Sequence, residues 1–200
     1  MDTHVYRIGN NLYINLTNRC TNRCSFCVRE QSAEYEGYSL WLKEGEPAAR
    51  QVIEEIGDPK RFDEVVFCGY GEPTFRLDAI KEICGYVHAN GGRTRLNTNG
   101  HGNVINGRNI AAELAGNLDG VNISLNAPDG EGYAAVCRPQ FDGAFEAMIG
   151  FAEDCKSAGV NCWFSVVDCI GEEKLDACRK VAERAGIPLR VREFIDNTEK

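Results

Sequence analysis

Strand-like and helix-like segments alternate along almost the whole chain, and this alternation limits the fold more than any other feature. The expected strands, the first two joined as a hairpin by Gly9-Asn10-Asn11, cover residues 5–8, 12–16, 64–68, 93–96, 120–125, 162–167 and 189–194. The expected helices cover residues 47–56, 77–90, 109–116, 141–157 and 172–185. Because strands separated by helices pair in parallel through right-handed crossovers, we expect a parallel sheet with helices packed on it.

The number of repeats indicates an incomplete barrel. A closed barrel of eight strand–helix repeats needs about 250 residues, whereas this chain has 200 residues. We therefore predict an α/β fold, an incomplete (β/α)6 TIM-like barrel with a short N-terminal β-hairpin, forming a single domain over residues 1–200. A doubly wound open sheet is the main alternative.

Polar and apolar residues alternate within the strands, which favours the barrel. Asn122, Ser124 and Asn126 alternate with apolar residues, and so do Arg190 and Arg192 near the end of the chain. Successive side chains of a strand point to opposite faces, so one face of the sheet should be polar. A parallel sheet with helices on both faces would have nearly continuous apolar strands instead. The polar face predicts a lumen that binds a ligand.

The composition is that of a globular protein. The net charge of −8 disfavours broad attraction to nucleic-acid phosphates. No apolar run reaches the roughly 18 residues of a membrane span, and the first residues do not resemble a signal peptide. We therefore expect a cytoplasmic protein without a membrane partner, whose ten cysteines are reduced. Those expected to act only as small apolar residues are Cys84, Cys155, Cys162 and Cys178.

Three other cysteines form a compact motif directly after the second expected strand. Cys20, Cys24 and Cys27 have C-x3-C-x2-C spacing. Three thiolates can ligate three irons of a cubane cluster and leave the fourth iron open for chemistry. One alternative is a zinc site built from Cys24 and Cys27 with distant ligands. An auxiliary cluster would draw on Cys68, Cys137 and Cys169.

A glycine-rich turn, Gly69-Tyr70-Gly71-Glu72-Pro73-Thr74, follows the strand expected at 64–68. Glycines let backbone carbonyls approach a ligand closely, and proline stiffens the turn. Such carbonyls suit an ammonium group, although a glycine-rich turn is also an ordinary link between a strand and a helix.

Amide and hydroxyl side chains follow the next two strands. Asn97 and Asn99 end one strand, and Ser124 and Asn126 end the next. Barrel active sites form at these carboxyl ends, and amides and hydroxyls can bind hydroxyl and carboxylate groups without adding charge. Asn99 and Asn126 also suit simple turns.

Together these motifs resemble the signature of the radical S-adenosylmethionine (radical SAM) superfamily, in which an aromatic residue such as Phe26 precedes the last cysteine. The resemblance implies that Cys20, Cys24 and Cys27 bind a [4Fe–4S] cluster whose open iron is chelated by SAM. It also implies that SAM is cleaved to a 5′-deoxyadenosyl radical, which abstracts hydrogen from a substrate. The implied SAM contacts are Phe26, Gly69, Tyr70, Gly71, Glu72, Pro73, Asn97, Asn99, Ser124, Asn126, Val166 and Asp168, with Val166 near the adenine.

Within the superfamily, the chain resembles the TatD-associated radical SAM proteins. The similarity covers nearly the whole chain and includes Ser39-Leu40-Trp41-Leu42 and Cys137-Arg138-Pro139. Tyr70 stands where many relatives have a second consecutive glycine. The resemblance implies a TatD-type hydrolase as a partner and an electron donor such as flavodoxin or ferredoxin.

The only indication of the substrate in the sequence is the positive charge of three arginines. Arg138, Arg190 and Arg192 can converge on the lumen, and guanidinium groups favour carboxylates and phosphates. The predicted function is a radical SAM enzyme with an unknown substrate, for which an anion is one hypothesis; no catalytic side chain is identified. The alternatives are a radical SAM enzyme that modifies or activates a protein or RNA, and a non-catalytic zinc or iron–sulfur module.

Overall fold

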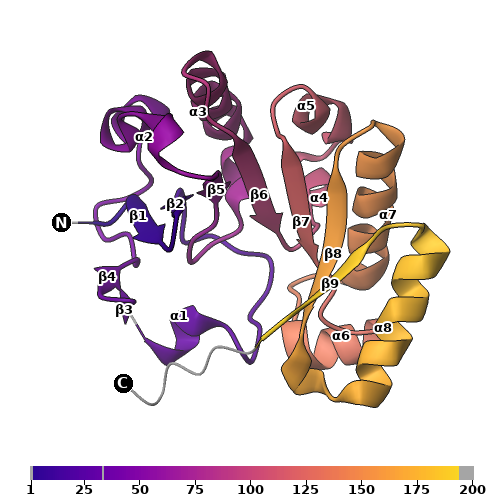
Figure 1. The fold of residues 1–200 in the computed structure, drawn as a ribbon. Helices are drawn as coiled ribbons and strands as arrows, with labels where there is room; N and C mark the ends of the chain where they lie inside the picture. The colour runs from indigo at the N-terminus through magenta and orange to yellow at the C-terminus, as the bar shows by residue number, and fades with distance from the viewer. Residues whose placement is uncertain (1, 33, 194–200) are drawn as a thin grey trace.

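A computed structural model describes residues 2–32 and 34–193, which are built around one curved seven-stranded sheet (Figure 1). Its strands are β1 (Val5–Ile8), β2 (Asn11–Ile14), β5 (Val65–Phe67), β6 (Thr94–Thr98), β7 (Gly120–Ser124), β8 (Cys162–Val167) and β9 (Leu189–Arg192). They lie in that order across the sheet; β1 pairs antiparallel with β2, and every later pair is parallel. A separate small hairpin consists of β3 (Glu34–Tyr35) and β4 (Tyr38–Ser39).

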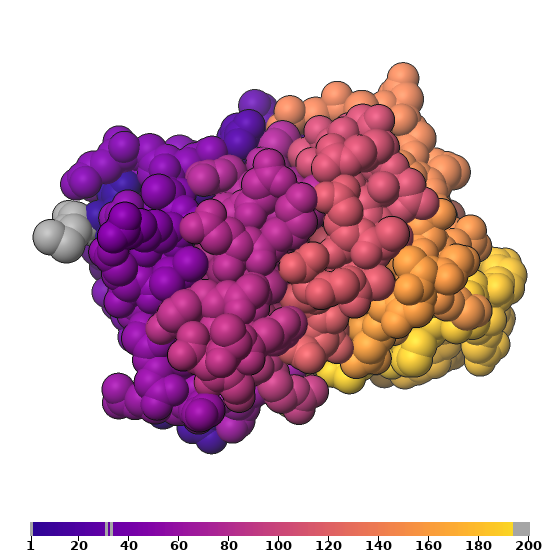
Figure 2. All heavy atoms as spheres, turned by 90° about the horizontal axis from the view of Figure 1, so that it is seen from above, coloured from indigo at the N-terminus to yellow at the C-terminus, as the bar shows by residue number. Residues whose placement is uncertain are grey.

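The strand order excludes a doubly wound sheet. In such a sheet the order reverses at a switch point, but here each strand lies beside its predecessor in the chain. Figure 2 shows the same progression, because the colours cross the molecule in chain order. The prediction of an incomplete barrel that begins with a hairpin is confirmed.

Helices connect the strands, and the longer ones cover the outside of the sheet, whereas the one-turn α1 (Val28–Gln31) lies apart from them (Figure 1). The other described helices are α2 (Ala49–Ile56), α3 (Leu77–Ala89), α4 (Gly102–Asn106), α5 (Ala111–Ala115), α6 (Gly130–Cys137), α7 (Ala144–Ser157) and α8 (Glu172–Ala185), with 3₁₀ turns η1 (Pro59–Arg61), η2 (Pro73–Arg76) and η3 (Asp168–Ile170). Gly57 and Gly186 follow α2 and α8 with φ angles of 62°, a backbone conformation that favours glycine. No helix in residues 2–32 and 34–193 is long and apolar enough to cross a bilayer.

The longer helices and the sheet strands were predictable, whereas the shortest elements were not. The sequence did not predict α1, α4, α6 or the β3–β4 hairpin, because short elements contain few repeats of a helix or strand period. The last residue of the strand expected at 189–194 lies outside the described residues.

The main apolar core lies between the sheet and these helices. Ile14, Phe67, Leu96, Ile123 and Phe164 project into it from successive strands, and each is 0% exposed. Apolar burial contributes about 25 cal/mol per Å², so this outer face of the sheet supplies much of the stability.

The inner face of the sheet is polar, as the alternation predicted. Asn97 lies beside Asn122 in the register, and Ser124 lies beside Ser165. Below them the Trp163 indole covers Gly120, where a Cβ would come within 2.9 Å of the ring. The inner face and the carboxyl ends of the strands are therefore available to form a site.

Candidate active site

The loop that carries Cys20, Cys24 and Cys27, here called the cysteine loop (residues 20–27), leaves the sheet after β2. Each of the three cysteines is partly exposed. Burial raises the pKa of Cys20 to about 11 and also raises that of Cys27. Because thiols must lose their protons when they bind a metal, ligation at this loop releases protons.

One end of the cysteine loop is held by Thr21. Asn99 Nδ2 donates to Thr21 Oγ1 at 2.8 Å, and Thr21 Oγ1 lies 2.8 Å from His101 Nδ1. His101 Nε2 lies 3.0 Å from the carbonyl of Ala144, so Nε2 carries the proton and Nδ1 accepts from the threonine. Burial lowers the pKa of His101 to about 4, and the imidazole is therefore neutral at neutral pH.

The other end of the loop is bound to the carboxyl end of α6. The amide of Arg23 donates to the carbonyl of Cys137 at 3.0 Å, and the amide of Ser25 donates to that of Val136 at 2.9 Å. Asn22 Nδ2 donates to the Tyr133 hydroxyl at 3.0 Å. Neither His101 nor Tyr133 was predicted as a site residue, because nothing in their local sequence indicates that they meet a loop about 80 or 110 positions earlier.

The glycine-rich turn approaches the segment between β2 and the cysteine loop too closely for any side chain. A Cβ at Gly69 would lie 2.2 Å from Asn15 Oδ1, and one at Gly71 would lie 2.3 Å from the carbonyl oxygen of Thr17. Between them Tyr70 is buried, and its hydroxyl donates to the carbonyl of Ser32 at 2.8 Å. The tyrosine therefore packs beneath α1 and leaves both glycines in place.

Glu72 is a buried carboxylate that ties this turn to β6. It accepts hydrogen bonds from Thr74, from the Thr98 hydroxyl at 2.7 Å and from the Asn99 amide at 2.7 Å. Burial raises the pKa of Glu72, and these donors oppose that effect. Both oxygens are engaged within the protein and the residue is 3% exposed. These contacts make Glu72 a positioning residue within the protein, and its predicted contact with SAM stays a prediction. Pro73 is also buried, at the start of η2.

The predicted polar residues of β6 and β7 lie on the inner face or just beyond it. Asn97 Oδ1 accepts from Arg95 Nη1 at 2.6 Å. Ser124 is half-buried beside Ser165. Asn126 adopts a φ of 60°, is 5% exposed, and its Oδ1 has no hydrogen-bond partner within the described residues. A buried amide oxygen without a partner is costly, and a ligand hydroxyl or ammonium group would satisfy it.

The Val166 side chain does not face the inner side of the sheet, and its predicted contact with the adenine stays a prediction. Val166 is 0% exposed in the core between the sheet and the helices. Side chains alternate along β8, so Val166 shares the outer face with the core residue Phe164, whereas Ser165 faces inward. A pocket of about 360 Å³ beyond the end of β8 is lined instead by Phe26, Asn126 and Ile170. Asp168 is exposed nearby, at the start of η3.

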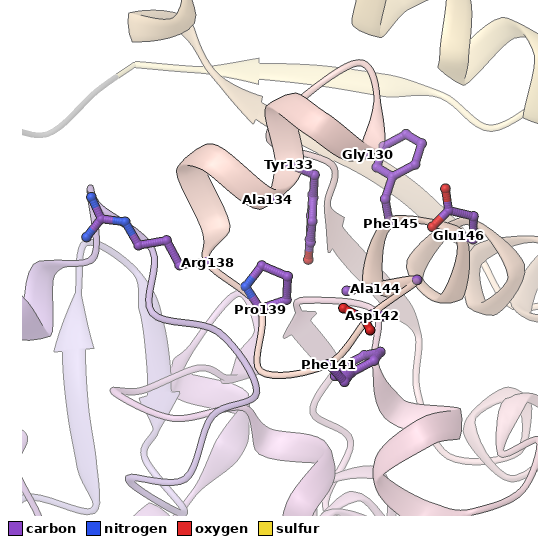
Figure 3. A pocket seen from close by; sticks show the side chains of 11 residues that line it. Gly130, Tyr133, Ala134, Arg138, Pro139, Phe141, Asp142, Ala144, Phe145 and Glu146 are labelled. Carbon is purple, nitrogen blue, oxygen red and sulfur yellow. The ribbon is translucent and has the colours of Figure 1, made fainter.

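The three predicted substrate arginines do not form one cluster. The Arg190 guanidinium stacks on Trp163, 3.9 Å from the ring centroid, and Arg192 follows two positions later on the same face of β9. Arg138 ends α6, and its side chain extends away from the other residues that line the pocket between α6 and α7 (Figure 3).

The comparisons with known proteins assign the family. The family model of the Radical SAM superfamily matches residues 14–185, and the chain belongs to this superfamily. It is 30% identical over 156 residues to GTP 3',8-cyclase 2 of Mycobacterium tuberculosis, covering 77% of this chain and 41% of that protein. It is 31% identical over 139 residues to GTP 3',8-cyclase of Corynebacterium glutamicum, covering 66% and 35%. The chain thus spans about two fifths of the length of these curated relatives.

Solved structures share the fold. Streptococcus suis SuiB bound to S-adenosylmethionine has a TM-score of 0.70 at 16% identity, covering 95% of this chain and 42% of that one. Native anSMEcpe with bound AdoMet has a TM-score of 0.66 at 17% identity, covering 94% and 52%. At these identities the likeness concerns the fold alone.

The residues present fit the cofactors of the superfamily, a [4Fe–4S] cluster and SAM. Three thiols on one loop can supply one ligand to each of three irons. The unpartnered Oδ1 atoms of Asn22 and Asn126 leave polar atoms free beside the loop.

Proposed function

We propose that this protein is a radical SAM enzyme in which Cys20, Cys24 and Cys27 hold a [4Fe–4S] cluster at the carboxyl ends of the barrel strands. The observation that carries the proposal is the convergence of the cysteine loop, the glycine-rich turn and Asn99 at one edge of the sheet. Arg29 Nη1 donates to the carbonyls of Asn18 and Tyr70, which joins the glycine-rich turn to the residues on either side of the cysteine loop. When bound, the cluster supplies the electron that cleaves SAM to a 5′-deoxyadenosyl radical.

The chain's own residues would bind and orient SAM. Carbonyls of the turn that includes Gly69 and Gly71 accept hydrogen bonds from the ammonium group, while Ser124 and Asn126 bind hydroxyl or carboxylate oxygens. Phe26 and Ile170 provide apolar surfaces for the adenine in the pocket that they line. Glu72 and His101 act indirectly, because they position Asn99 and Thr21.

Anaerobic incubation with SAM and dithionite tests the proposal. The reconstituted wild-type chain should produce 5′-deoxyadenosine, and SAM should change the electron paramagnetic resonance spectrum of the reduced cluster. Cys24→Ala should bind less iron and form no 5′-deoxyadenosine. Cys155→Ala is the matched control, because Cys155 is buried in the core. A wild-type cluster whose spectrum does not respond to SAM would contradict the proposal.

The proposed substrate is an anion that reaches the inner face of the sheet near β9. Arg190 is held on Trp163 at 3.9 Å, and a guanidinium fixed in this way can bind a carboxylate or phosphate bidentately. The curated relatives are named for GTP, which carries such phosphates. Binding of GTP and of tripolyphosphate should weaken at least about tenfold in the Arg190→Gln/Arg192→Gln double variant, the equivalent of about 1.4 kcal/mol. Unchanged affinity for both, or no binding to the wild type, would contradict this assignment.

The proposed working context is that of the TatD-associated radical SAM proteins. The motifs at residues 39–42 and 137–139 support this placement. We expect a low-potential donor such as flavodoxin or ferredoxin to reduce the cluster and a TatD-type hydrolase to act with the enzyme. Anaerobic co-purification of the reconstituted chain with a TatD-type hydrolase tests the second expectation, with the cluster-free Cys24→Ala chain as a comparison.

A further inference from the structure

Cys137 occupies a place beside the cysteine loop that the proposed function does not use. It is the last residue of α6 and is 0% exposed. The hydrogen bonds from the Arg23 and Ser25 amides to the carbonyls of Cys137 and Val136 lie on either side of Cys24. The backbone therefore holds Cys24 against the end of α6, where Cys24 packs against the core cluster that includes Cys137.

The end of α6 is shaped for this contact. Arg138 adopts a φ of 46° and ends the helix in the left-handed region, which leaves the Cys137 carbonyl free to accept from Arg23. These contacts involve backbone atoms, so they use none of the thiols that would bind metal.

The surroundings of Cys137 orient its proton. Asn126 Nδ2 donates to Cys137 Sγ at 3.4 Å, so the sulfur already accepts one hydrogen bond from the inner side. In the metal-free chain either thiol can donate to the other. A thiolate bound to iron has no proton, however, so Cys137 must then be the donor and Cys24 the acceptor.

We propose that the Cys137 thiol donates a hydrogen bond to the iron-bound sulfur of Cys24 and thereby raises the reduction potential of the cluster. The inference rests on the proposed function, since it requires Cys24 to be a cluster ligand. Hydrogen bonds to the sulfurs are among the features that set the potential of an iron–sulfur cluster. The added electron increases the negative charge on the sulfurs, so a donor stabilises the reduced form more than the oxidised form. No covalent bond of Cys137 forms or breaks, and the single electron that reduces the cluster comes from dithionite or a flavodoxin-type donor.

The test is a redox titration of the reconstituted cluster, followed by electron paramagnetic resonance without SAM. Cys137→Ala removes the donor, Cys137→Ser keeps one, and Cys155→Ala is the control for loss of a buried thiol. At a fixed potential we expect the ratio of reduced to oxidised cluster to fall up to about tenfold in Cys137→Ala, a shift of about 59 mV to more negative potential for a one-electron couple. Cys137→Ser and Cys155→Ala should remain close to the wild type.

Equal potentials in the wild type and Cys137→Ala would overturn the inference, and so would an equal shift in Cys155→Ala. If the Cys137→Ala variant does not retain its iron, the inference is tested on the wild-type cluster alone. Electron–nuclear double resonance of its reduced cluster, in H₂O and in D₂O, should show an exchangeable proton coupled to the cluster, and its absence would contradict the inference. Failure of the proposed function gives a different result, because the wild type would then form no cluster that responds to SAM.

Discussion

Phe164 and Ser165 are neighbours on β8 and are both 0% exposed, yet they show two different uses of burial. Phe164 packs in the core between the sheet and the helices. Ser165 lies on the inner face, where its hydroxyl has no hydrogen-bond partner within the described residues. Side chains on the outer face of the strand are packed in the apolar core, whereas on the inner face the Ser165 hydroxyl is left without a hydrogen bond within the described residues.

The same contrast extends to the neighbouring strands. On the outer face, Leu96 and Ile123 belong to the core. On the inner face, Asn122 is 4% exposed and its Oδ1 also has no partner within residues 2–32 and 34–193. Unpaired buried polar atoms are costly to a fold, and proteins retain such groups at sites that bind ligands. The outer face therefore serves stability, and the inner face is where we propose that ligands bind.

The largest expected change in stability comes from a substitution on the outer face of the sheet. Phe164→Ala should lower the free energy of unfolding by about 3 to 5 kcal/mol, because it removes a fully buried ring and leaves a cavity. Urea denaturation under anaerobic conditions measures the change. Arg179→Ala on the exposed side of α8 is the control and should change little. A loss below about 1 kcal/mol would show that the outer face does not carry the core.

The next effect concerns the buried imidazole that supports the cysteine loop. Burial lowers the pKa of His101 from 6.5 to about 4 in the folded chain. The unfolded chain therefore binds more protons between these values, and stability is lost as the pH falls from 6.5 towards 4. The His101 contribution to this loss should be about 3 kcal/mol, at about 1.36 kcal/mol for each pKa unit.

Denaturation of the wild type and of His101→Gln between mildly acidic and slightly alkaline pH isolates this contribution. The variant should be less stable at neutral pH and should lose less stability as the pH falls. Parallel pH profiles for the two chains would contradict the assignment. The His4→Gln variant is the control, because His4 contacts Glu55 rather than the cysteine loop.

A smaller loss of stability is expected from a change at Glu72, where the glycine-rich turn meets β6. Glu72→Gln replaces one carboxylate oxygen by an amide group that cannot accept a hydrogen bond. The Asn99 and Thr74 amides cannot reverse their direction, so one buried donor should lose its partner at a cost of about 1 to 3 kcal/mol. Isothermal titration should also show weaker SAM binding, since Asn99 is positioned by this carboxylate. Unchanged stability together with unchanged SAM affinity would refute this role.

The smallest expected effect is a gain in stability rather than a loss. Ser165→Ala removes a buried hydroxyl without a partner in the described part of the chain and should raise the free energy of unfolding by about 1 kcal/mol. The same change should weaken the binding of a ligand that uses the hydroxyl. Urea denaturation tests stability, and titration with SAM and GTP tests binding. Destabilisation of the variant would mean that the inner face is as complete as the outer face.

Local patterns predicted the elements of the fold and the position of the proposed cluster ligands. The alternation around Asn122 and Ser124 predicted the polar face, because parity depends only on neighbours in the chain. The same reasoning places the Val166 side chain on the outer face, because Val166 has the parity of the core residue Phe164. The glycines at 69 and 71 were noted for their backbone freedom, but only the fold shows that Asn15 and Thr17 require them.

The supporting residues of the site could not be predicted. Glu72 was assigned to SAM, and only its contacts with Thr98 and Asn99 reveal that it positions the turn. His101 and Tyr133 looked like ordinary residues of connecting segments. Their roles depend on contacts with residues far away in the chain, for which the local sequence carries no signal.

The sequence by itself determined the spacing of the three cysteines, the order of strands and helices, and the polar parity of the inner face. These properties arise from covalent neighbours and from the periods of helix and strand. Only the tertiary structure decided which groups meet the cysteine loop. It brought Cys137 to Cys24 from a distant part of the chain, because the crossover connections of the barrel place the end of α6 against the loop that follows β2.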